Sequence, residues 1–192
     1  ENIEVLVVDD GSKDKTRSEA IKSGAKVISH DTNKGVGEAF QTGLKWALSS
    51  KKDILVNIDA DGQFNPDDIP GLIEPILQNN ADVVVANRFQ KGRPENMSAT
   101  KYHGNKMMTF LINKLSGLNL TDVSSGFRAY NREAMLRLNL LGGFTYTQES
   151  ILDLSTKGLR VRNHDVKVIY FKSRKSRVAS SIPSYALKTS AI

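Results

Sequence analysis

Two aspartates and a glutamine, Asp59, Asp61 and Gln63, are the residues of this chain best suited to bind a metal ion. They follow the apolar run 54–58, which has the length of a buried strand. Side chains alternate along a strand, so the two carboxylates are expected to point the same way, and Gly62 lets the backbone turn after them. Mg²⁺ and Mn²⁺ prefer such oxygen ligands and leave positions for substrate phosphates. The pattern therefore predicts metal-assisted handling of a phosphorylated substrate.

Helix capping is the structural alternative for these carboxylates. Residues 65–68 already supply an N-cap, a first-turn proline and two first-turn acids for the next helix, so Asp59 and Asp61 are not needed for that purpose. An EF-hand is excluded, because the positions of its glycine and its last glutamate hold Phe64 and Pro70.

The composition is that of a globular domain. The chain has 192 residues, of which 39% are hydrophobic and 25% charged, enough to bury a core. No apolar run approaches the roughly 18 residues of a membrane helix, and there is no secretory signal. The lack of cysteine excludes disulfides, thiolate metal sites and a cysteine nucleophile. We therefore expect a cytoplasmic protein.

The net charge of +6 is concentrated near the end of the chain. Residues 157–177 contain eight basic residues and one acidic residue. Such a run is often only a solvated surface. Its confinement to one end nevertheless favours a partner that carries phosphate, such as a lipid headgroup or a nucleotide.

Apolar runs of strand length alternate with segments of helical period. This alternation predicts an α/β fold, Rossmann-like, with a mostly parallel sheet and helices on both faces. Strands are expected at 3–8, 26–29, 54–58, 83–87, 127–130 and 166–171, and helices at 15–23, 35–49, 66–77, 103–115, 132–138 and 148–157. Ligands of such sheets bind beyond the carboxyl ends of the strands. The polar residues at those ends include Asp9, Asp10, Ser12, Lys34, Gly35, Asp59, Asn87 and Arg88.

In their order and spacing, these motifs resemble glycosyltransferase family 2, in the branch of dolichol-phosphate mannose synthases and other polyprenyl-phosphate hexosyltransferases. The resemblance covers nearly the whole chain. The motifs that carry it are Val8-Asp9-Asp10-Gly11-Ser12, Asn33-Lys34-Gly35 with Gly37, Asp59-Ala60-Asp61-Gly62-Gln63, Asn87-Arg88, Ser124-Ser125-Gly126-Phe127-Arg128, Gln148-Glu149 and Arg174 to Arg177.

The resemblance implies a GT-A fold and an inverting, metal-dependent transfer of a hexose. The donor would be a nucleoside diphosphate sugar of the GDP-mannose or UDP-glucose type, and the acceptor a polyprenyl or dolichyl phosphate. It also implies a catalytic domain over 1–177 whose first strand would lie before Glu1, so that the chain is expected to be a fragment. Residues 178–192 are expected to form an extension that leads to a membrane segment.

Residue roles also follow from the resemblance. Nucleotide binding falls to Asp9, Asp10, Ser12, Lys34, Gly35 and Asp59. Binding of Mg²⁺ or Mn²⁺ falls to Asp59, Asp61 and Gln63. Binding of the acceptor phosphate falls to Arg88, Arg128, Arg174 and Arg177. The residues expected to act in catalysis are Asp61, Arg88, Arg128 and Glu149.

The acceptor decides whether a general base is needed. A phosphate oxygen is already anionic and attacks without losing a proton, whereas a sugar hydroxyl would need a carboxylate to remove its proton. Glu149 is the candidate base, and an ordinary acid in the first turn of a helix is its structural alternative. Arg88 and Arg128 could likewise be paired structural arginines, although the arginine fork suits phosphate.

Two alternatives belong to other functional classes. A phosphorelay receiver domain also pairs acids with Mg²⁺ and would explain Asp59, but it gives no role to Gln63 or Arg128. The other is a binding module without catalysis, which would hold nucleic acid or an anionic membrane through the basic stretch. It lacks aromatic residues among the basic ones beyond Tyr170 and Phe171, which fit a strand better. We therefore expect as partners a sugar nucleotide, a lipid phosphate and an anionic membrane surface, with no nucleic acid. The expected location is the cytoplasmic face of a membrane.

Overall fold

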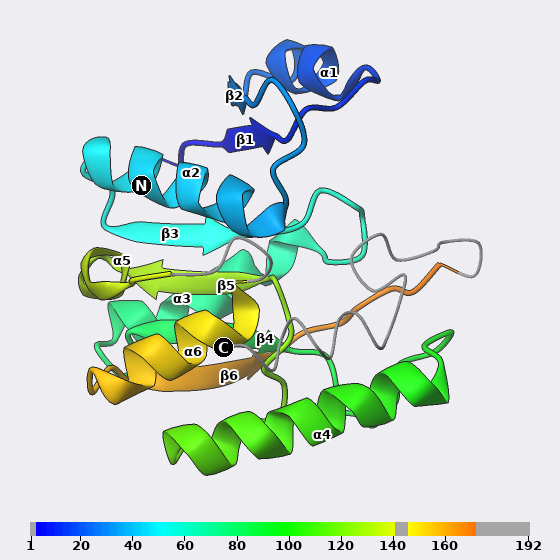
Figure 1. The fold of residues 1–192 in the computed structure, drawn as a ribbon, viewed down its shortest axis with the longest axis vertical. Helices are drawn as coiled ribbons and strands as arrows, with labels where there is room; N and C mark the ends of the chain where they lie inside the picture. The colour runs from blue at the N-terminus through cyan, green and yellow to red at the C-terminus, as the bar shows by residue number, and fades with distance from the viewer. Residues whose placement is uncertain (1–2, 141–145, 172–192) are drawn as a thin grey trace. The chain divides into compact units, whose positions relative to one another are not determined.

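The computed structural model describes residues 3–140 and 146–171. The chain divides into two compact units, Glu1–Lys52 with Leu140–Tyr146 and Asp53–Asn139 with Thr147–Ile192. Strands and helices alternate along both (Figure 1). The predicted single domain over 1–177 thus comprises two units, and its predicted boundary lies outside the described residues.

The first unit is a parallel pair of strands with two helices. Strand β1 (Leu6–Asp9) pairs in parallel with β2 (Lys26–Ser29), and the helices are α1 (Thr16–Lys22) and α2 (Val36–Ser49). Helix α2 buries Phe40, Leu44 and Ala47, whose spacing places them on one face. The ring of Phe40 stacks on Tyr146, with 4.0 Å between centroids. Helix α2 also contacts β1.

The second unit contains a four-stranded sheet in the order β3-β5-β4-β6. Its strands are β3 (Ile54–Asn57), β4 (Val83–Asn87), β5 (Arg128–Asn131) and β6 (Val161–Asp165). Strand β5 runs antiparallel to β3 and β4, whereas β4 and β6 are parallel. The helical segments are η1 (Pro66–Asp68), α3 (Ile69–Leu77), α4 (Ala99–Ser116), α5 (Arg132–Arg137) and α6 (Thr147–Thr156).

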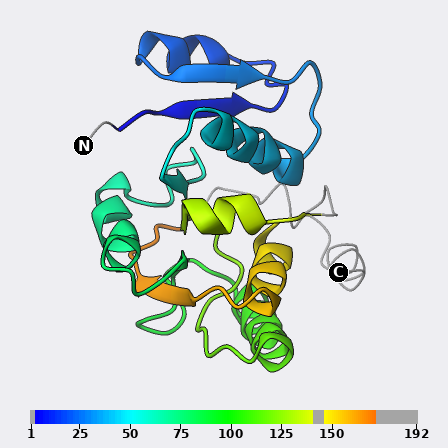
Figure 2. The ribbon, with the colours of Figure 1, turned by 90° about the vertical axis from the view of Figure 1, so that its left-hand side faces the viewer.

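Strand β4 forms the centre of the core, and all five of its residues are buried. Its alternate residues Val84 and Ala86 pack with Leu72 and Ile76 of α3. Helix α6 contacts β6, and Figure 2 shows α3 and α6 on opposite sides of this sheet. A strand that is covered on both faces has a continuous apolar sequence, and for this reason the bounds of β4 were predicted correctly. The expected α/β class, with helices on both faces of the sheet, is confirmed. The sheet is mixed, because β5 runs antiparallel to both of its neighbours.

Most elements match their predicted bounds to within one residue, and β1 begins three residues later than predicted. Two differences are larger. The last strand is β6 at Val161–Asp165, so the prediction of a strand at 166–171 is wrong. The residues of β6 are mostly polar, so the sequence shows no apolar run at this strand. Asn163 donates to Val85 O at 3.0 Å and accepts from Thr121 N at 2.6 Å, so its amide is satisfied inside the sheet. Helix α4 begins four residues earlier than predicted because Ser98 caps it by accepting from Lys101 N at 3.3 Å.

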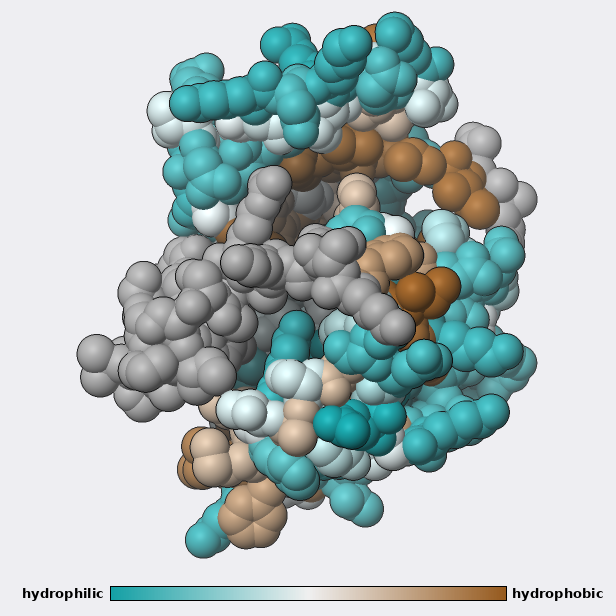
Figure 3. Space-filling model, turned by 90° about the vertical axis from the view of Figure 1, so that its right-hand side faces the viewer, coloured by the Kyte–Doolittle hydropathy of each residue, from teal (hydrophilic) through white to brown (hydrophobic). Residues whose placement is uncertain are grey.

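Helix α4 carries a row of exposed apolar side chains. We call the row the α4 face, formed by Met107, Phe110, Leu111 and Leu115. Brown and tan side chains among teal ones mark this helix at the lower end of Figure 3. Among the described residues, no helix is long and apolar enough to cross a bilayer.

Candidate active site

The carboxylate of Asp9 closes the turn that follows β1. Its Oδ1 accepts from Ser12 N at 3.1 Å and its Oδ2 accepts from Ser29 Oγ at 3.4 Å. A hydrogen bond from the Ser12 side chain, helped by the one from Ser12 N, outweighs burial and lowers the pKa of Asp9, so the group is ionised at neutral pH. Gly11 has a φ of 72°, and an added Cβ would lie 2.7 Å from Asn33 N, so this turn requires glycine.

The carboxylate of Asp10 is held by two backbone N–H groups and a histidine. Its Oδ1 accepts from Lys34 N at 2.9 Å and its Oδ2 accepts from Gly35 N at 2.8 Å, at the start of α2. Burial alone would raise the pKa of Asp10, but these backbone donors and His30 lower it. Each carboxylate oxygen can accept two hydrogen bonds, so Oδ2 has room for a second donor.

His30 is a site residue that the sequence reasoning missed. Its Nδ1 lies 2.7 Å from Asp10 Oδ1 and its Nε2 lies 2.9 Å from Thr42 Oγ1 of α2. Because an ionised carboxylate only accepts, Nδ1 carries a proton and donates it to Asp10. His30 directly follows β2, at a strand end like the residues that were identified. The structure therefore brings Asp10, Lys34 and Gly35 together and adds a histidine that orients the carboxylate.

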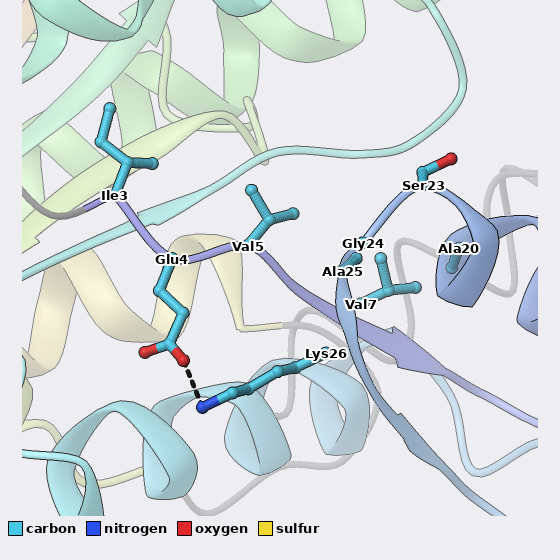
Figure 4. A pocket seen from close by; sticks show the side chains of 9 residues that line it. All are labelled: Ile3, Glu4, Val5, Val7, Ala20, Ser23, Gly24, Ala25 and Lys26. Carbon is cyan, nitrogen blue, oxygen red and sulfur yellow. Dashed lines mark ion pairs between the residues drawn. The ribbon is translucent and has the colours of Figure 1, made fainter.

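A hollow beside the start of β1 is separate from this cluster. It is lined by Ile3, Val5, Lys26 and neighbouring residues, and Glu4 forms an ion pair with Lys26 there (Figure 4). Asp9 and Asp10 lie at the other end of β1 and do not line it.

In the second unit, the turn after β3 presents the predicted metal ligands. Asp59 is exposed and Asp61 is half-buried. Asp61 Oδ1 accepts from Gln63 N at 2.9 Å across Gly62, whose φ is 72°. Ile169 N donates to Gln63 O at 2.9 Å, so the chain after β6 runs beside this turn and fixes it. Carboxylate and amide oxygens of this kind are hard ligands, and they fit Mg²⁺ or Mn²⁺.

Arg88 is held by a buried carboxylate that the sequence reasoning also missed. Its Nε and Nη2 donate to the two oxygens of Asp122, at 2.6 and 2.9 Å, and its Nη1 donates to Tyr170 Oη at 3.3 Å. Burial opposes the charge of Arg88, but Asp122 outweighs it and raises the pKa of the guanidinium. Burial raises the pKa of Tyr170, and the charge of Asp61 contributes to that rise. Tyr170 thus contacts Arg88, while the backbone of its neighbour Ile169 contacts the predicted metal turn at Gln63.

Arg128 is wholly buried and braces a loop. Its guanidinium donates to the carbonyl oxygens of Ser125, Thr147 and Val123 at 2.6 to 2.8 Å, and to Ser150 Oγ at 2.9 Å. These bonds tie the loop before β5 to the start of α6. In this conformation Arg128 faces protein atoms, and phosphate binding by Arg128 stays a prediction.

The remaining predicted site residues lie as follows. Glu149 lies in the first turn of α6, within the predicted helix, and is buried there. Its role as a base stays a prediction. Ser12 and Lys34 are exposed residues. Ser12 donates to Asp9 through its side chain as well as its backbone N–H, whereas Lys34 donates to Asp10 through its backbone N–H. Arg174 and Arg177 lie outside the described residues.

Comparison with known proteins identifies the family. Residues 1–138 match the family described as Glycosyl transferase family 2. The chain is 34% identical to the UDP-N-acetylglucosamine–dolichyl-phosphate N-acetylglucosaminyltransferase of Methanococcus voltae, over 86% of this chain and 74% of that protein. It is 33% identical to the undecaprenyl-phosphate mannosyltransferase of Micrococcus luteus, over 71% of this chain and 58% of that protein.

Solved structures confirm the fold. A crystal structure of glucosyl-3-phosphoglycerate synthase from Mycobacterium tuberculosis, in complex with phosphoglyceric acid, is 25% identical with a TM-score of 0.66. The match covers 90% of this chain and 62% of that one, so the present chain spans less than two thirds of that enzyme. The complex of the same enzyme with Mn²⁺ and UDP-glucose gives a TM-score of 0.67 at 23% identity, covering 97% of this chain and 68% of that one.

Proposed function

Because the chain belongs to glycosyl transferase family 2 and is therefore a glycosyltransferase, we propose that it moves a hexose from a nucleoside diphosphate sugar to a polyprenyl or dolichyl phosphate, with inversion at the sugar carbon. The acceptor class is supported by two relatives that, by their names, act on dolichyl phosphate and undecaprenyl phosphate. The family match over residues 1–138 favours this function over the receiver-domain alternative. We further propose that the reaction takes place at the cytoplasmic face of a membrane.

Asp10 is the residue that we assign to the nucleobase. It is ionised, and three hydrogen bonds from Lys34, Gly35 and His30 fix its orientation. A fixed carboxylate oxygen with room for one more donor suits a ring N–H of uracil or guanine. Asp9 and Ser12 shape the turn beside it, and Asp59 is proposed to lie near the ribose and the metal.

The observation that carries the proposal is the turn after β3, where Gln63 N and Gly62 hold Asp61 in place. We propose that Asp59, Asp61 and Gln63 bind Mg²⁺ or Mn²⁺ on the donor diphosphate. When bound, the cation would neutralise charge on the leaving diphosphate. The protein holds these oxygens in place through a turn that contains Gly62 and is fixed by the hydrogen bond from Ile169 N to Gln63 O.

Arg88 is proposed to act at the acceptor phosphate. Two N–H groups of Arg88 donate to Asp122, which orients the guanidinium. Nη1 donates one of its two N–H groups to Tyr170, and its second N–H group can donate to an anion. Arg128 supports the same region through the loop that it braces. Arg174 and Arg177 are proposed as further phosphate ligands. An anionic phosphate oxygen as nucleophile needs no general base.

A transfer assay with radiolabelled UDP-sugars and GDP-sugars tests the proposal. Undecaprenyl or dolichyl phosphate should accept label only when Mg²⁺ or Mn²⁺ is present, and EDTA should abolish the reaction. Transfer to a free sugar or to phosphoglycerate, sensitive to Glu149→Gln, would instead support a hydroxyl acceptor with Glu149 as base. Absence of transfer to any prenyl phosphate, together with efficient transfer to a hydroxyl acceptor, would overturn the assignment.

A further inference from the structure

The α4 face is exposed along one side of its helix. Phe110 is 69% exposed and Leu115 is 62% exposed, and both lie with Met107 and Leu111 on a single stripe. The opposite side of α4 packs into the unit through Thr109 and Ile112, both buried, and α4 contacts α6. Helix α4 is therefore apolar on two sides, although only one of them is used by the core. Figure 3 shows apolar side chains protruding among polar ones at this helix.

The charges on α4 are all of one sign. Its 18 residues include Lys101, Lys106 and Lys114 and no acidic residue. At about 100° per residue, Lys106 and Lys101 fall on opposite flanks of the stripe and Lys114 falls within it. Two of these lysines rest on aromatic rings: Lys101 Nζ lies 5.3 Å from the Tyr170 ring centre and Lys106 Nζ lies 5.3 Å from that of Phe89. An apolar stripe flanked by lysines is the arrangement of helices that lie in a membrane interface.

We propose that the α4 face docks the enzyme on an anionic lipid surface, with Met107, Phe110, Leu111 and Leu115 in the acyl boundary and the three lysines at the headgroups. A second copy of the chain is a poorer occupant, because two α4 faces in contact would bring lysines together with no acid on either helix. The choice of lipid over a protein partner rests on the proposed function, whose acceptor is a membrane lipid.

The position of α4 relative to the acceptor residues supports this role. Tyr170, which lies under Lys101, also receives a hydrogen bond from Arg88. The helix that meets the headgroups is thus separated by one aromatic side chain from the arginine proposed to bind the lipid phosphate. Docking through α4 would hold Arg88 near the plane in which lipid phosphates lie.

Vesicle co-sedimentation of the full chain tests the inference. The test variant is Phe110→Gln with Leu115→Gln, and the matched control is Leu77→Gln with Leu136→Gln, whose leucines are 60% and 59% exposed on α3 and α5. Binding to vesicles of phosphatidylcholine and phosphatidylglycerol should fall at least about tenfold in the test variant, because two inserted side chains are lost. The control should bind like the wild type. Lys106→Gln with Lys114→Gln should reduce binding only when phosphatidylglycerol is present.

Three results would overturn the inference: no binding of the wild type, equal binding of test and control variants, or a wild-type dimer that the test variant converts to a monomer while vesicles bind neither. Circular dichroism verifies that both variants retain their helix content.

Transfer to a short-chain, water-soluble prenyl phosphate separates the two proposals. If this transfer survives in the test variant while vesicle binding is lost, docking is separate from catalysis, as inferred. If no prenyl phosphate is used but the vesicle pattern holds, the proposed function fails and the docking inference stands.

Discussion

Arg88 and Asp122 form a bidentate ion pair whose carboxylate is wholly buried and whose arginine side chain is 10% exposed. Arg160 and Asp82 form a pair of the same geometry, with Nε–Oδ2 and Nη2–Oδ1 distances of 2.9 Å, but the arginine is 46% exposed. The two pairs therefore differ mainly in burial. Removing one partner of a buried pair leaves a charge without compensation, whereas water compensates a charge at the surface.

Asp122→Asn should consequently lower the free energy of unfolding by about 3–5 kcal/mol. Asp82→Asn, the matched surface change, should lower it by about 1 kcal/mol. Urea unfolding at neutral pH followed by fluorescence measures both. Equal losses in the two variants would show that burial does not determine the contribution of Arg88–Asp122.

The Asp82 pair should also give stability a defined pH dependence. The hydrogen bond from Arg160 is the main cause that lowers the pKa of Asp82 to about 2. A lowered pKa contributes stability above the unfolded pKa of about 3.9, and this contribution is lost as the pH falls towards 2. Because Arg160 is partly exposed and water screens the pair, we expect ionised Asp82 to contribute about 1 kcal/mol to the free energy of unfolding. The difference in unfolding free energy between wild type and Asp82→Asn should therefore shrink between about pH 5 and pH 2. Arg160→Gln should remove most of this dependence.

The sequence revealed the turns at strand ends because their chemistry is local. Asp10 and Asp61 sit beside glycines and directly after apolar strands, so three or four residues suffice to recognise them. The role of Arg88 could not be predicted in this way, because its partner Asp122 lies 34 residues away and is defined by packing. For the same reason Arg128 could not be distinguished from an exposed arginine. The buried strand β4 was predicted well and the polar strand β6 was not, since Asn163 is satisfied only by tertiary contacts.

His30→Phe should weaken nucleotide binding by removing one of the donors that orient Asp10. A hydrogen bond to a charged group contributes enough for an increase of about tenfold in the dissociation constant of a nucleoside diphosphate. Affinity for pyrophosphate with Mn²⁺ should not change, because Asp10 is assigned to the base. Isothermal titration calorimetry measures both, with His103→Phe on the exposed side of α4 as the control. A parallel loss of pyrophosphate affinity would indicate general damage and contradict the positioning role.

Asp61→Asn should abolish metal-dependent stabilisation by the donor nucleotide. Wild-type protein should show a higher Tm with UDP or GDP plus Mn²⁺ than with nucleotide alone, because ligands that bind the folded state stabilise it by mass action. The variant keeps an oxygen ligand but loses the charge, so the Mn²⁺ increment should vanish and transfer should fall by about 100-fold or more. Asp67→Asn, an exposed acid in η1, is the control. An unchanged Mn²⁺ increment in Asp61→Asn would rule out the metal assignment.

Two helical glycines should respond to alanine with opposite signs. A Cβ on Gly71 of α3 would lie 2.4 Å from His164 Nε2 of β6, whereas a Cβ on Gly104 of α4 would meet no atom within 4 Å. Alanine is the better helix former, so Gly104→Ala should raise the free energy of unfolding by about 0.5–1 kcal/mol. Gly71→Ala should instead lower it by about 1–3 kcal/mol, because the imidazole or the helix must move. Urea denaturation measures both changes, and adding His164→Ala should recover part of the loss in Gly71→Ala. If Gly71→Ala were as stabilising as Gly104→Ala, the close approach of α3 to β6 would not exist in solution.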